Sequence, residues 1–91
     1  MLRITEKKEG KNTRVLRLEG KICQEWIKEL EAEIIRGLDD GKKIALDFSK
    51  VGFIDEDAAE MIKRFPQKKV ERRNGSLFIR TVLGMEDRGQ K

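Results

Sequence analysis

The sequence predicts an α/β domain in which a mixed β-sheet packs against helices. Two short alternating segments on either side of a Gly/Asn turn indicate a β-hairpin near the N-terminus, and a helical pattern then precedes a continuous apolar run. A second helical pattern follows that run. A strand, a helix and a strand in succession require a crossover connection, which is right-handed if the two strands are parallel. A chain of 91 residues has room for one core, so we expect residues 1–91 to form a single domain.

The first two predicted strands cover residues 2–6 and 13–18. Leu2 and Ile4 alternate with polar neighbours, and TRVLRL forms the second strand. The intervening KKEGKN contains Gly10 and Asn12, which tolerate a positive φ, and therefore predicts the turn of a hairpin.

A helix and a buried strand are predicted next. From Gln24 onward, apolar residues recur at spacings of three and four until DDG at 39–41 ends the pattern. The run IALDF at 44–48 has apolar residues at successive positions, which indicates a strand buried on both faces. The apolar face of the helix comprises Trp26, Ile27, Leu30, Ile34 and Leu38.

The stretch VGFIDEDAAEMIKRF predicts the start of a second helix. Asp57, with Glu60 three residues later, is a variant of the capping box, and Pro66 ends the pattern. Ser49, before this stretch, is predicted to be a turn residue. The apolar stripe of this helix, which we assign to the core, comprises Ala58, Ala59, Met61, Ile62 and Phe65.

The last third of the chain leaves one alternative open. Residues 70–73 fit a short strand and Asn-Gly at 74–75 fits a turn. SLFIRTVL fits a strand by its β-branched and aromatic content, and fits a helix by its i,i+4 apolar pairs and by Ser76 as N-cap. We favour a helix at 76–83, which makes the element order β-β-α-β-α-β-α. Residues 85–91 are predicted to fray.

The composition excludes several kinds of site. The chain has no histidine and one cysteine, which removes a histidine base, a histidine metal ligand and an internal disulfide. No phosphate-binding loop, paired nucleophile and base, or cofactor fingerprint is present, so we expect neither an enzyme nor a cofactor. No segment has the length and apolarity of a signal peptide or a membrane span, which favours a cytoplasmic protein without membrane insertion.

The net charge of +4 makes nucleic acid an alternative partner. The region Lys63–Arg73 is rich in lysine and arginine. Basic residues elsewhere are interleaved with acids, and no exposed aromatic residues for base stacking are evident, so we rank this alternative second. A metal site is not expected either, because consecutive side chains at a helix start do not converge on one cation.

The chain resembles the STAS domain, the fold of bacterial anti-sigma-factor antagonists. In that family a strand written like LDLSGVTFID precedes D-S-[ST]-G, which opens the next helix. Here LDFS at 46–49 and the residues Val51, Phe53, Ile54 and Asp55 match the middle of the pattern. NGSLFIRTVLG resembles the later loop, serine and helix of the family, and the resemblance covers residues 13–84. It implies a STAS-like fold, shortened at its C-terminus relative to longer members.

The resemblance implies a regulatory protein-binding module in signalling and transcription regulation. Family members dock the surface around the D-S-[ST]-G helix onto a partner, which in the switching members phosphorylates the second hydroxyl residue. Here Asp55 matches the aspartate, Glu56 the first serine, Asp57 the phosphorylated residue and Ala58 the glycine. A carboxylate does not accept a phosphoryl group in the stable manner of serine, so we expect no phosphorylation switch at position 57; the nearest hydroxyl is on Ser49.

The partner implied is an anti-sigma factor or serine kinase, or a multi-protein complex, with a structural subunit of a transport or sensory complex as another alternative. The three acids have three roles that the sequence leaves open: capping a helix, forming an acidic rim for a partner, or imitating a phosphorylated residue in part. The predicted partner-binding residues are Asp55, Glu56, Asp57, Ala58, Glu60, Lys63 and Arg64.

Overall fold

The computed structural model describes residues 1–85 and contains one four-stranded sheet and three helices in the predicted order. The sheet order is β1-β2-β3-β4, in which β1 and β2 are antiparallel and the other two pairs are parallel. The mixed sheet of the predicted α/β fold is therefore confirmed. The elements are β1 (Leu2–Glu9), β2 (Thr13–Ile22), α1 (Glu25–Asp39), β3 (Lys43–Ile54), α2 (Glu56–Lys63), β4 (Val70–Arg73) and α3 (Leu77–Val82).

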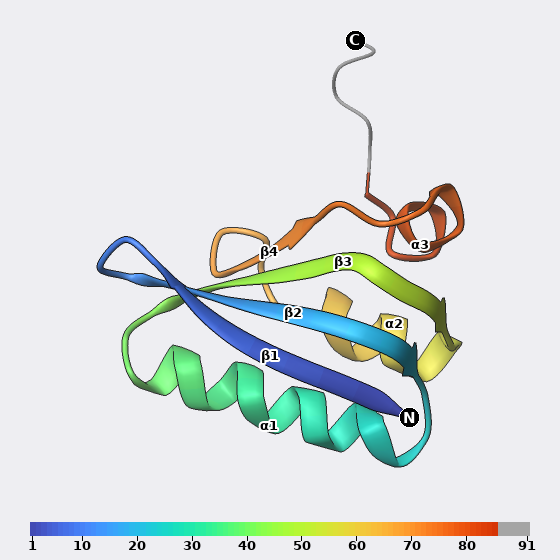
Figure 1. The fold of residues 1–91 in the computed structure, drawn as a ribbon, viewed down its shortest axis with the longest axis horizontal. Helices are drawn as coiled ribbons and strands as arrows, with labels where there is room; N and C mark the ends of the chain where they lie inside the picture. The colour runs from blue at the N-terminus through green and yellow to red at the C-terminus, as the bar shows by residue number, and fades with distance from the viewer. Residues whose placement is uncertain (86–91) are drawn as a thin grey trace, which may run out of the picture.

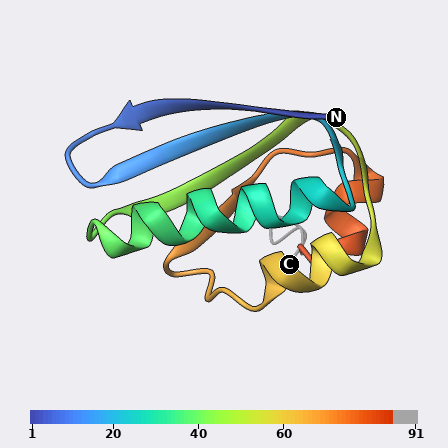
Figure 2. The same ribbon diagram turned by 90° about the horizontal axis from the view of Figure 1, so that it is seen from below.

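Helices α1 and α2 cover the same face of the sheet (Figures 1 and 2). Leu30 and Ile34 of α1 are fully buried, as the helical spacing predicted, and Met61 and Ile62 of α2 also lie in the core. Helix α3 packs against β3 and adds Ile79 to the same cluster. The predicted core faces of both long helical segments are confirmed.

The hairpin is longer than the sequence predicted. Strand β1 runs to Glu9, through residues assigned to the turn, and β2 runs on to Ile22. Charged side chains do not interrupt β1 because it is an edge strand whose side chains reach solvent. In β2, Gly20 has a φ of 108°, and a Cβ there would overlap the carbonyl oxygen of Met1. Only glycine fits that approach.

Strand β3 contains the irregularities that shape the site. Its pairing with β2 shifts register between Arg17 and Glu19 and again between Gly20 and Lys21, which inserts extra residues in β3. Ser49 therefore lies within the strand, and its assignment to a turn was wrong. Each bulge resets the alternation of side chains. As a result Ile54 is buried whereas Phe53 faces solvent.

The cap of α2 differs from the predicted one. The Asp55 carboxylate accepts a hydrogen bond from the Ala58 backbone N–H at 2.9 Å, so Asp55 is the N-cap. The capping box at Asp57 and Glu60 was therefore wrong, because the helix begins two residues earlier than that motif requires. At the start of α3, the Ser76 hydroxyl accepts from the backbone N–H of Ile79 at 3.2 Å, which confirms the choice of helix there.

The predicted fraying concerns residues 85–91; Met85 is partly buried against the core, and the remainder of that segment lies outside the described residues.

Candidate functional site

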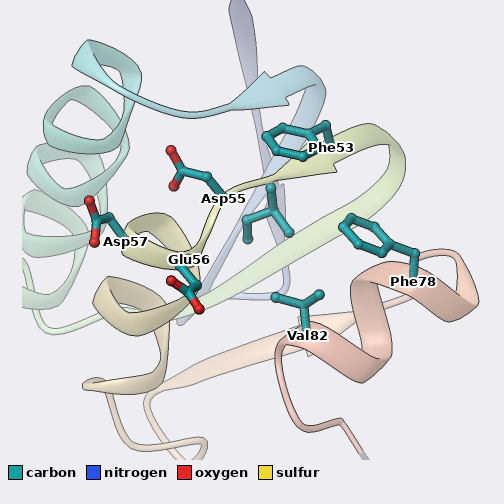
Figure 3. Close-up of a pocket in the computed structure, with 7 residues that line it drawn as sticks. Phe53, Asp55, Glu56, Asp57, Phe78 and Val82 are labelled. Atoms are coloured by element: carbon teal, nitrogen blue, oxygen red, sulfur yellow. The ribbon is translucent and has the colours of Figure 1, made fainter.

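The corner between β3 and α2 holds an open hollow of about 470 Å³ (Figure 3). One part of its wall comes from the end of β3, a second from the first turn of α2, and a third from α3. It thus joins segments that are separated by more than twenty positions in the sequence. The lining residues are Phe53, Ile54, Asp55, Glu56, Asp57, Phe78 and Val82.

Phe53 and Phe78 are exposed at this corner, and the exposed Leu77 precedes Phe78 in α3; we call these three residues the apolar patch. The exposed fractions of Phe53, Leu77 and Phe78 are 40%, 81% and 48%. The rings of Phe53 and Phe78 stack with centroids 6.2 Å apart and planes 18° from parallel. None of these three residues was among those predicted to form the site. The alternation of β3 could not reveal Phe53, because its exposure depends on the bulges.

Asp55, Glu56 and Asp57, which we call the acidic rim, form the other side of the hollow (Figure 3). Asp55 is half-buried because its carboxylate caps the helix, whereas Glu56 and Asp57 are exposed. Among residues 1–85, the hydrogen bonds and ion pairs found include none for the side chains of these last two acids. They lie in the first turn of α2, where the helix dipole stabilises negative charge.

The other predicted partner-binding residues divide into two groups. Glu60, Lys63 and Arg64 are exposed on α2, as a docking role requires. Ala58 is fully buried, so its inclusion in the partner surface was wrong. Its side chain points into the core because it belongs to the apolar stripe that α2 packs against α1 and the sheet.

Hydrogen bonds and ion pairs cross the sheet face opposite to α1 and α2. Asp47 accepts from the Asn74 side chain and the Ser49 backbone, each at 3.0 Å. Partial burial alone would raise the pKa of Asp47, but these hydrogen bonds and the nearby Arg17 guanidinium hold it below its ordinary value. This network joins β3 to the turn before α3, and so helps to place the apolar patch.

A second network on that face centres on Arg73. Its guanidinium binds the Glu9 carboxylate at 2.8 Å and the Glu71 carboxylate at 3.0 Å. The hydrogen bonds from Arg73 are the main cause that lowers the pKa of both glutamates, and the same bonds raise the pKa of Arg73. Because Glu9 is on β1 and Arg73 is on β4, the contact links the two edges of the sheet.

A basic hollow of about 460 Å³ lies at the opposite end of β3 from the acidic rim. Arg72 and Arg73 of the predicted nucleic-acid region do not contribute to it. Arg72 donates to the carbonyls of Ile62 and Phe65 at the end of α2, and Arg73 is held by Glu9 and Glu71. Nucleic-acid binding there would depend on lysines alone. The hollow is lined by Asn12, Leu38, Gly41, Lys42, Lys43, Lys68 and Lys69.

Over the part of the chain that the structure describes, no group of three or more Cys, Asp or Glu side chains is arranged to hold a metal ion. No helix between residues 1 and 85 has the length and apolarity to cross a membrane.

Comparison with known proteins relates most of the chain to one family. A family model of the STAS domain matches residues 5–85. The fold is similar to the solved structure of the anti-sigma factor antagonist SpoIIAA in its unphosphorylated form, with a TM-score of 0.71 and 18% identity over 92% of this chain and 84% of that one. No curated protein matches the sequence. Because this match covers most of the chain, from within β1 to the end of the described residues, the chain belongs to the STAS domain family.

Proposed function

We propose that this chain is a non-catalytic regulatory module that acts by docking to another protein through the exposed side of α2. The docking residues are Asp55, Glu56, Asp57, Glu60, Lys63 and Arg64. The observation that carries the proposal is the exposure of Glu56 and Asp57 at the helix start that opens the family's partner-binding helix. Membership of the STAS family supports a binding role, and the likeness to an anti-sigma factor antagonist suggests a signalling role in transcription regulation.

The partner class that we propose is an anti-sigma factor or serine kinase, or a multi-protein complex that assembles around STAS domains. Docking here is not switched by phosphorylation at Asp57. A phosphorylated serine carries about −1.5 to −2 charge and three acceptor oxygens, whereas an aspartate carries one charge and two oxygens. Asp57 therefore holds a constant charge at the position where switching relatives change theirs.

Site-specific cross-linking tests the docking surface. A photoreactive amino acid is placed at Glu60, and in a matched control at Lys68, which lies between α2 and β4 and lines the basic hollow. After incubation in extract of the source cells, we expect Glu60 to cross-link to a discrete protein that the Lys68 variant does not capture. Capture by both positions, or by neither, would contradict docking through α2.

Intact-mass measurement tests the absence of a phosphorylation switch. The chain without a cross-linker is incubated with the partner identified by capture and with ATP, and we expect the mass of the chain to stay unchanged. A phosphate on Ser49 or Ser76 that dissociates the complex would contradict the proposal. The Ser76 hydroxyl already accepts the Ile79 N–H at the start of α3, so its phosphorylation would disturb that cap.

A further inference from the structure

The apolar patch is not needed to complete the core. Ile54 and Ile79, next to Phe53 and Phe78 in sequence, fill the core with exposed fractions of 2% and 0%. Phe53 and Phe78 instead stack on each other at the surface, and Leu77, which precedes Phe78 in α3, is 81% exposed. Contiguous exposed apolar side chains with a polar border are typical of protein-interaction sites. In a chain of which 42% is charged, their grouping at one corner is a distinct feature.

The charged residues that line the hollow all have one sign. The residues that line the hollow include the three carboxylates of the acidic rim and no cation. Glu56 and Asp57 form no ion pair among the described residues, so their charges are available to an incoming group. The cations of α2, Lys63 and Arg64, lie at its other end. Complementary charge favours encounter with basic groups and disfavours acidic ones.

We propose that the partner presents a basic amphipathic segment to this corner. A large aliphatic or aromatic side chain of the segment packs against Phe53 and Phe78, and its Arg or Lys residues face the acidic rim (Figure 3). An amphipathic helix can present the apolar side chain and the basic residues together, because residues three and four positions apart share a face. The inference rests on the proposed docking function and adds the chemistry of the partner, as well as a contribution from α3.

Binding of designed peptides to the isotope-labelled full chain tests this inference by NMR. The probe is a sixteen-residue amphipathic helix with leucines on one face and arginines beside them. One control peptide has glutamate in place of arginine, and another has serine in place of leucine. We expect the probe to shift the backbone amides of Phe53, Asp57 and Phe78 saturably, and each control to bind at least about tenfold more weakly.

Variants of the chain identify the surface. Phe78→Ser and Leu77→Ser remove apolar contacts at exposed positions, and we expect each to weaken probe binding about tenfold. Asp57→Lys reverses one charge of the acidic rim and should weaken binding more at low salt than at high salt. Lys68→Glu, at the other end of β3, is the matched control and should leave the affinity unchanged. Circular dichroism verifies that each variant is folded.

Several results would overturn the inference: no saturable binding of the probe, equal binding of the glutamate peptide, shifts centred on the basic hollow, or patch variants that bind normally. Self-association of the chain that Phe78→Ser abolishes would assign the patch to a second copy and would overturn it too. A failure of this inference can be distinguished from a failure of the proposed docking function. If Glu60 cross-links to a protein that Phe78→Ser still captures, docking through α2 stands and the partner chemistry is wrong.

Discussion

Asp55 accepts the backbone N–H of Ala58 at 2.9 Å, and this single contact makes Asp55 the cap of α2 while Asp57 stays exposed. The three consecutive acids therefore have different roles. Asp55 satisfies one of the free N–H groups at the helix start. Glu56 and Asp57 leave their carboxylates to solvent or to a partner.

The two aspartates should separate in stability measurements. Asp55→Ala should lower the free energy of unfolding by about 1 kcal/mol, because the Ala58 N–H loses its acceptor. Asp57→Ala should change it by less than about 0.5 kcal/mol, since the lost interaction with the helix dipole is offset by the higher helix propensity of alanine. Urea unfolding measures both values. If Asp57→Ala lowers the free energy of unfolding as much as Asp55→Ala does, Asp57 contributes to capping as well.

Arg72 should contribute to stability through the end of α2. Its guanidinium donates to the carbonyl oxygens of Ile62 and Phe65 at 2.6 and 2.9 Å, and desolvation by burial lowers the pKa of Arg72. Arg72→Met keeps an apolar stem but removes the donors, and should cost about 1.5–3 kcal/mol of unfolding free energy. Arg72→Lys restores part of this loss. If the Met variant is as stable as the wild type, the hydrogen bonds from Arg72 to these two carbonyl oxygens do not contribute to stability.

Acid should destabilise the domain in part through Asp47. Its pKa is lower in the folded chain than its ordinary value, so its contribution is complete above the unfolded value of about 4 and is lost as pH falls through the folded pKa. Asp47→Asn should lower stability at pH 7 and should flatten the decline below about pH 4. Urea titrations from pH 7 to pH 2 measure this. Parallel pH profiles for the variant and the wild type would exclude Asp47 as a source of the decline.

The orientation of α2 has a direct test in adjacent residues. Met61 is 2% exposed, so Met61→Asp would bury an unpaired charge and should unfold the domain. Glu60→Lys, one position earlier, changes an exposed residue and should remain folded. Circular dichroism and NMR distinguish the two outcomes. A folded Met61→Asp chain would show that this face of α2 is not in the core.

The pattern of apolar residues in the sequence was sufficient to predict the fold, but it was not sufficient to predict the site. The spacing of Leu30, Ile34, Met61 and Ile62 predicted which helix faces are buried, because a helix must place its apolar residues on one side to pack. The helix cap was not determined in the same way. Asp55 and Asp57 are both suitable N-cap residues, and the choice depends on where β3 ends and the chain turns.

The sequence by itself determined the element order, the core faces of α1 and α2, and the presence of three consecutive acids after β3. Tertiary structure decided which side chains meet them. Phe53 faces outward only because β3 bulges against β2, and Phe78 reaches it only because α3 packs beside the end of β3. Local periodicity encodes burial within one element. The stacked pair that borders the acidic rim depends on register and on packing between residues 25 positions apart, which no local pattern specifies.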